Sequence, residues 1–284
     1  MAVSPPPQLH GFLRLLRGAE RPRPGLRRIA LALLVGLSCH GLFALAAFCM
    51  IGGMAVGMSH GLGQVPDPWR WPANLLLLAQ FPLVHSLLLH RRFRHMLAVI
   101  VPGRHGETLS SSTYVVVASL QLTALFLLWT PSGSIWWEAE GAVRVALLLV
   151  YGSTWLLLLK ATIDAGFEVQ SGALGWLSLL RGVRPRYPGM PEHGLFRRLR
   201  HPIYAAFILT LWTVPVWTPD QLLLAAMLSA YCLLAPMLKE RRYRERYGVA
   251  FSEYQERVPY IIPALTPRYH PNSSPGKESL CEDE

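Results

Sequence analysis

Charged side chains are scarce in this chain. Asp, Glu, Lys and Arg together make up 15% of its 284 residues, whereas soluble domains carry about 25%. Hydrophobic residues account for 52% of the sequence, and the mean hydropathy is +0.30. The deficit of charge and the long charge-free runs exclude an ordinary soluble domain and indicate an integral membrane protein.

Cysteine is also rare, and its spacing excludes two common kinds of site. The chain has four cysteines and no C-x-x-C motif. Three of them, Cys39, Cys49 and Cys232, lie in apolar runs, where cysteine serves as a small apolar side chain. Neither a disulfide framework nor a cysteine metal site is expected. The histidines show no metal-ligand spacing either, so we expect no metal.

Acidic residues are outnumbered by basic ones, 17 to 27, for a net charge of +10. In a soluble protein this excess would suggest a nucleic-acid partner. Here the arginines flank apolar runs, which is typical of residues that set membrane topology. We therefore expect a lipid bilayer around the chain and no nucleic-acid partner.

Apolar runs long enough to cross a bilayer, about 20 residues, predict the fold class. The expected fold is an all-α, polytopic membrane helix bundle of about six transmembrane helices, followed by a cytoplasmic amphipathic C-terminal helix. A turn signal at 218–221 makes the last two spans a tight hairpin, with one bent segment as the alternative. The six spans are 29–57, 72–90, 113–130, 142–161, 202–218 and 221–238.

The basic residues predict the orientation of the bundle. Of the 27 Lys and Arg residues, 25 fall on one side of the predicted spans, and only Arg70 and Arg144 fall on the other. Positive residues collect in the cytoplasm, so both termini are expected there. The first apolar run is too long for a cleavable signal peptide.

Composition divides the chain into four parts. Residues 1–28 form a basic N-terminal segment, and 29–161 hold the first four spans. Residues 162–263 include an expected interfacial helix at 171–182, the last two spans and the amphipathic helix. Residues 264–284 are polar and rich in Pro and Ser, which predicts a disordered tail.

A candidate binding site lies at the cytoplasmic ends of the last two spans. Proline is favoured at the first helical position, so R-H-P at 200–202 reads as a helix start carrying Arg200 and His201. A helix N-terminus adds partial positive charge, which suits an anion. If the two spans match in length, Glu240 comes level with this cluster. The cationic cluster and the Glu240 carboxylate together would suit a zwitterion, such as the amino-acid end of a methionine-derived cofactor.

Aromatic residues follow Glu240 at helical spacing. Tyr243, Tyr247, Phe251 and Tyr254 recur every three or four residues before Pro259. The stripe either covers a bound adenine ring or rests on the membrane interface.

The order G-L-F-R-R-L-R-H-P-I-Y (194–204) and then K-E-R-R-Y-R-E-R-Y-G-V-A-F-S-E-Y-Q-E-R-V-P (239–259) resembles the isoprenylcysteine carboxyl methyltransferase superfamily. Residues 70 to 263 resemble its branch of methanethiol S-methyltransferase and NnrU-type proteins, which suggests a bacterial inner membrane. The resemblance implies a membrane methyltransferase that uses S-adenosyl-L-methionine. By motif position, the implied cofactor-binding residues are Gly194, Arg200, His201, Tyr204, Glu240, Tyr247, Phe251 and Tyr254. Phe196 would line the approach to the cofactor.

Two departures from the family bear on catalytic activity and on the methyl acceptor. The family's paired glutamates are Lys239 and Glu240 here, and its N-H-F motif is replaced by I-D-A-G-F-E-V at 163–169. Asp164 is either a substitute polar group or a solvated loop acid. His85, inside the second span, is either a catalytic candidate or part of an interhelical hydrogen bond. The acceptor is expected to be a small thiol or a lipid or isoprenoid group.

Three functions compete at this point. The first is the methyltransferase. The second is a non-catalytic NnrU-type protein that retains the fold, which the replacement at Lys239 favours. The third is a reductase of the sterol type, which the short chain and missing nicotinamide-type motifs disfavour.

Overall fold

The computed structural model describes residues 25–89, 94–101 and 105–263. Most of the basic segment 1–28 and the whole expected disordered tail, 264–284, lie outside these ranges. The described chain is helical apart from its connections and one short strand pair, which agrees with the predicted all-α class.

Five helices in the described residues are long and apolar enough to cross a membrane. They are α2 (Leu26–Ala55), α3 (Arg70–Leu89), α5 (Gly106–Leu127), α6 (Gly141–Asp164) and α10 (Pro219–Tyr247). The shorter helices are α4 (Arg94–Ile100), α7 (Phe167–Gln170), α8 (Ala173–Arg181), α9 (Pro202–Trp212) and α11 (Val249–Arg257), with a 3-10 turn, η1 (Gly194–Arg197).

The expected span at 202–218 is wrong in length. Its helix, α9, has 11 residues, which at 1.5 Å per residue extends about 16 Å, roughly half the hydrocarbon thickness. The chain then forms strand β2 (Val216–Trp217), which pairs antiparallel with β1 (Trp137–Glu138). Backbone groups that are not in a helix need other hydrogen-bond partners at this position, and the strand pair supplies them. The chain turns back there into α10, as the hairpin prediction required.

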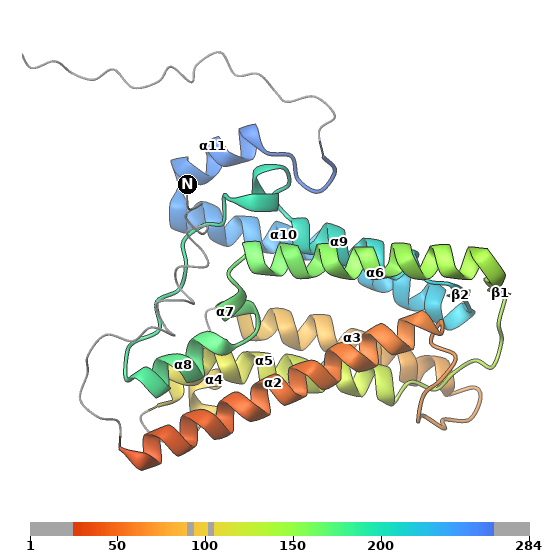
Figure 1. Ribbon diagram of the computed structural model, residues 1–284, viewed down its shortest axis with the longest axis horizontal. Coiled ribbons are helices and arrows are strands. Elements are labelled where there is room, and N and C mark those ends of the chain that lie inside the picture. Colours follow the sequence, from red (N-terminus) through yellow and green to blue (C-terminus); the bar gives the residue numbers. More distant parts are fainter. Residues whose placement is uncertain (1–24, 90–93, 102–104, 264–284) are drawn as a thin grey trace, which may run out of the picture.

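The long helices and α9 contact one another in the order α6, α9, α10, α3, α5, α2. The first and last helices of this order also meet, because the Tyr151 hydroxyl of α6 donates to the Ile51 carbonyl of α2 at 2.8 Å. In Figure 1 the β1–β2 pair lies at one end of the helices, and α4, α8 and α11 lie toward the other. The site motifs sit at the end with α11.

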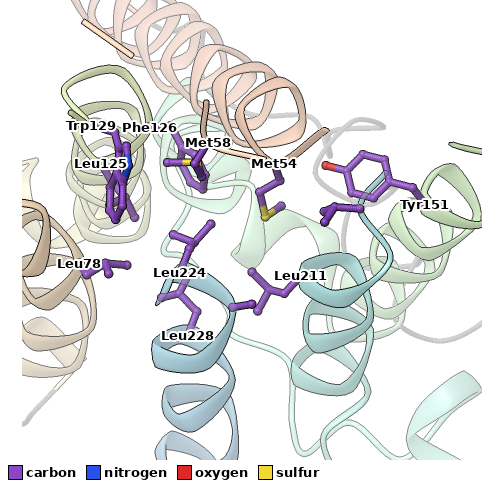
Figure 2. Packing of buried hydrophobic residues seen from close by; sticks show 12 residues of the cluster. Met54, Met58, Leu78, Leu125, Phe126, Trp129, Tyr151, Leu211, Leu224 and Leu228 are labelled. Atoms are coloured by element: carbon purple, nitrogen blue, oxygen red, sulfur yellow. The ribbon is translucent and has the colours of Figure 1, made fainter. Parts of the chain in front are cut away.

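The main hydrophobic core lies in the half of the bundle toward the strand pair. Figure 2 shows Leu224 and Leu228 of α10 between Leu78 of α3 on one side and Leu211 of α9 on the other. The fully buried Trp129 completes this core and donates its indole N–H to Asp220 at 2.9 Å. This packing fixes how α9 and α10 stand relative to the rest of the bundle.

Large apolar side chains are also exposed on the outer faces of the long helices. The outer face of α6 alone presents Val143, Val145, Leu148, Leu149, Val150, Leu156 and Leu159. A surface of this kind matches hydrocarbon rather than water, which supports the membrane assignment.

The helix expected at 171–182 forms as α8, but its apolar residues are buried inside the protein. Leu179 packs with Ala32 of α2 and Leu109 of α5, and the Trp176 indole donates to His40 at 3.0 Å. The apolar face that suggested a membrane surface therefore packs on α2 and α5.

Candidate functional site

The site is built around the start of α9. His201 is the N-cap residue and Pro202 occupies the first turn, as the R-H-P sequence predicts. Pro202 has no amide hydrogen to leave unpaired, and its fixed φ suits the helix. Arg200 and His201 are thereby held at the entrance to α9.

Glu240 of α10 meets both residues, as predicted, although α9 is shorter than the expected span. Arg200 Nε donates to Glu240 Oε1 at 2.8 Å, and His201 Nε2 lies 2.9 Å from the same oxygen. Arg244 adds a longer ion pair at 3.6 Å. Glu240 and His201 are both buried, so these bonds act in a low-dielectric setting, where they are stronger than in water.

The α11 helix closes this network from the other side. Gln255 Nε2 donates to Glu240 Oε2 at 2.6 Å. Arg200 Nη1 donates to the carbonyls of Gln255 and Val258, at 2.9 and 2.6 Å. The sequence did not single out Gln255, although its spacing of four from Phe251 placed it on the same helical face. We call Arg200, His201, Glu240 and Gln255 the charge network.

His201 keeps one buried ring nitrogen without a hydrogen-bond partner in the described chain, Nδ1. Burial lowers the pKa of His201, and the bond to the Glu240 carboxylate opposes that shift. Because a carboxylate only accepts hydrogen bonds, we place the neutral ring's proton on Nε2. Nδ1 then presents a free lone pair.

Gly194 and Asp164 position the turn that leads into R-H-P. The Leu195 amide donates to Asp164 Oδ2 at 2.8 Å, and Lys160 Nζ donates to the same carboxylate at 2.6 Å. Gly194 has φ +60, and a Cβ there would lie 2.2 Å from Asp164 Oδ2. Asp164 is therefore a buried, fully engaged residue rather than a solvated loop acid.

The aromatic stripe packs α11 onto the site. Tyr243 contacts Tyr247 and Phe251 with ring centroids 5.4 and 5.6 Å apart. Phe251 and Tyr254 are buried, and the Tyr254 hydroxyl donates to the Phe196 carbonyl at 2.6 Å. Burial raises the pKa of Tyr254. The stripe lies between α11, α10 and η1 rather than on a membrane surface, and its covering of an adenine ring stays a prediction.

Lys239, next to Glu240 in sequence, holds its ammonium against two aromatic rings. Its Nζ lies 5.9 Å from the ring centroid of Phe196 and 5.3 Å from that of Tyr243. No carboxylate in the described ranges pairs with it, although Glu240 is its neighbour in sequence.

His85 belongs to a second polar cluster, inside the bundle. The hydroxyl of Tyr114, from α5, lies 2.7 Å from His85 Nε2, and His85 Nδ1 is buried with no partner among the described residues. The adjacent Ser86 lies 3.3 Å from the hydroxyl of Tyr231 on α10. The interhelical hydrogen bond expected as one alternative is therefore present, and the second ring nitrogen is left over.

Tyr204 stands between the two clusters. It lies one turn into α9, and its ring centroid is 5.9 Å from that of His201. It also lies near Tyr231 of the second cluster. The sequence did not single out Tyr114 or Tyr231; a hydroxyl inside an apolar run was the only signal for either.

Comparison with known proteins finds several relatives. Methanethiol S-methyltransferase 1 of Bradyrhizobium diazoefficiens is 32% identical over 191 residues, which are 67% of this chain and 66% of that protein. Methanethiol S-methyltransferase of a Pseudomonas species is 28% identical over 237 residues, 81% of this chain and 89% of that protein. Human nurim is 30% identical over 191 residues, 62% of this chain and 68% of that protein. No protein-family model and no solved structure matches.

The membrane-spanning helices, the R-H-P and Glu240 motifs brought together by α9 and α10, and these relatives define a polytopic membrane methyltransferase. The relatives match over most of the chain, beyond the two motifs alone. The chain belongs to the isoprenylcysteine carboxyl methyltransferase-like superfamily, which confirms the resemblance read from its motifs.

Proposed function

We propose that the chain methylates a small thiol and that S-adenosylmethionine, the methyl donor, binds between the start of α9, the end of α11 and the adjoining part of α10. The charge network carries this proposal, because it buries cationic and anionic side chains next to each other at a helix N-terminus. The methanethiol S-methyltransferases among the relatives support the class of acceptor.

The residues present fit the amino-acid end of S-adenosylmethionine in charge. That end carries an ammonium and a carboxylate. Glu240 uses three of a carboxylate's roughly four acceptor sites within the charge network, which leaves one on Oε2 for the ammonium. The cationic side chains of Arg200 and Lys239 suit the carboxylate. The buried His201 Nδ1 has no partner in the described chain, and a buried polar atom without a partner calls for a ligand or water. These residues are our candidates for holding the donor.

The remaining predicted cofactor residues have supporting roles in this proposal. Tyr204 faces His201 and lines the donor site. Phe251 and Tyr254 hold α11 over the charge network, with Tyr247 at the edge of the stripe. Gly194 lets the preceding turn approach Asp164. Asp164 is a positioning residue in this scheme, because it holds the Leu195 amide in the turn that leads into Arg200 and His201.

S-adenosylmethionine, when bound, supplies an electrophilic methyl group. The task of the chain is then to align the acceptor, exclude water and remove the thiol proton. Thiols are mostly protonated at neutral pH, and the thiolate is the nucleophile. We propose that His85 takes that proton at its free Nδ1, while the Tyr114 hydroxyl holds Nε2. The short distance to Tyr114 keeps the imidazole in one orientation.

The charge distribution supports the placement of the site. With 25 of 27 basic residues on one side of the spans, we propose that both termini and the charge network face the cytoplasm. The bacterial methanethiol S-methyltransferases support the inner membrane of a bacterium as the location.

Methyl transfer to methanethiol tests the proposal. The full chain, purified in detergent, is given methanethiol and S-adenosylmethionine with a labelled methyl group, and labelled dimethyl sulfide is measured in the headspace. We expect product from the wild type and from Arg241→Ala, whose side chain is 79% exposed beside Glu240. We expect none from Glu240→Ala or His201→Ala. A folded wild type that binds the donor but methylates no thiol would support the non-catalytic alternative instead.

A further inference from the structure

The ammonium of Lys239 is a cation beside the charge network that the described chain does not neutralise. It lies against two aromatic rings, Phe196 and Tyr243, and forms no ion pair there. We infer that Lys239 binds the carboxylate of a substrate. The inference rests on the proposed function, because it places this carboxylate in the methyl-transfer site.

Glu240 forms no direct ion pair with Lys239. Successive residues of an α-helix diverge by about 100° around its axis, so neighbouring side chains point in different directions. The Glu240 carboxylate turns toward Arg200, His201 and Gln255, and both of its oxygens accept bonds there. Two arginines, Arg200 and Arg244, already balance its single negative charge.

The surroundings of Lys239 favour an anion rather than a second cation or a neutral group. An ammonium on an aromatic face is held by the ring quadrupole, but the ring offers no hydrogen-bond acceptor. Half-buried as it is, the ammonium loses part of its hydration without gaining an acceptor from the described chain. A carboxylate at this position would restore both the charge balance and the hydrogen bonds.

Lys239 also stands beside the proposed donor site. Phe196 belongs to η1, four residues before Arg200, and Tyr243 is the next turn of α10. S-adenosylmethionine carries a carboxylate at its amino-acid end, and a thiol acceptor can carry one as well. The chemistry that Lys239 recognises is the same in both cases, and the two sources are separable by experiment.

The test compares substrates that differ only by a carboxylate. The donors are S-adenosylmethionine and its decarboxylated form, and the acceptors are 1-propanethiol and 3-mercaptopropionate. Each is measured with the wild type, Lys239→Met and Lys239→Arg, as full chains in detergent. Thermal melting of each variant reports folding, and the KM of each substrate is read separately from kcat.

We expect Lys239→Met to raise the KM of one carboxylate-bearing substrate about tenfold or more, the loss expected for a charge-assisted hydrogen bond. The KM of its carboxylate-free counterpart should not change, and Lys239→Arg should keep the wild-type preference for the substrate with the carboxylate. A change confined to the donor pair identifies the donor's carboxylate, and a change confined to the acceptor pair identifies the acceptor's.

Equal KM changes within each pair, or no change in a folded Lys239→Met protein, would overturn the inference while leaving the methyltransferase proposal in place. If Lys239→Met does not fold, a wild type that shows no preference for a carboxylate on either substrate overturns it instead. Failure of the wild type to transfer a methyl group to any thiol contradicts the proposed function itself.

Discussion

Replacing Gly194 with alanine should destabilise the turn that carries the chain into Arg200 and His201. Gly194 has φ +60, where an L-residue costs about 1–2 kcal/mol. The new Cβ would lie 2.2 Å from Asp164 Oδ2 and 2.4 Å from its Cγ, so the carboxylate must move. Moving it breaks the Leu195 N–H bond to Asp164, a hydrogen bond to a charged group worth about 1.5–3 kcal/mol.

Together these effects should lower the free energy of unfolding by about 2.5–5 kcal/mol. By the scaling for proteins of this size, that lowers the melting temperature by roughly 5–20 °C. The assay is thermal unfolding in detergent, followed by circular dichroism. Gly189→Ala is the matched control in the same connection, because a Cβ at Gly189 meets nothing within 4 Å.

A second substitution separates the two contributions. In an Asp164→Ser background the carboxylate that clashes with the new Cβ is gone. Gly194→Ala should then lower the free energy of unfolding only by the cost of the positive φ, about 1–2 kcal/mol. If Gly194→Ala melts like Gly189→Ala, or costs the same with and without Asp164, the close approach does not position this turn.

Three further predictions follow from the charge network. Arg200→Lys should loosen α11, because a lysine ammonium cannot reproduce the three hydrogen bonds that the planar Arg200 guanidinium donates. Faster hydrogen exchange confined to α11 is the expected result, and unchanged exchange contradicts it. Tyr254→Phe removes the bond to the Phe196 carbonyl and should cost about 1–3 kcal/mol in thermal unfolding, because a buried acceptor is left without a partner. Because burial lowers the pKa of His201 in the folded state, the unfolded chain binds its proton first, so stability should fall as pH drops below about 6.5. A melting profile from pH 5 to 8 should be flatter for His201→Gln, and an equal slope in both proteins refutes the assignment.

Much of the fold was predictable from hydropathy and charge, because membrane helices must be long, apolar and flanked by basic residues. The failure at 202–218 has a physical cause. That segment is apolar enough to span, but Val216 and Trp217 pair with a strand near the start of α6, and apolar content alone does not reveal such pairing. The burial of α8 was missed for a related reason, since an apolar helical face suits a protein neighbour as well as a membrane surface.

The meeting of Arg200, His201 and Glu240 was predictable because a tight hairpin fixes how far each residue stands from the turn. The contribution of α11 was not. Gln255 reaches Glu240 only because the chain breaks at Gly248, where φ is +53, and folds back. The angle of such a break is set by packing between helices rather than by periodicity within one. The pairing of Asp164 with Leu195 likewise brings the end of α6 to η1, and the sequence does not encode locally that these two elements meet.

Equilibrium binding of labelled S-adenosylmethionine to the purified chain tests the central claim, that the charge network is the methyl-donor site. The comparison is between the wild type, Glu240→Gln and the exposed neighbour Arg241→Ala, all checked for folding. Binding by the wild type and Arg241→Ala, with a loss of about tenfold or more in Glu240→Gln, is the expected result. Binding of equal strength by all three folded proteins would contradict the claim.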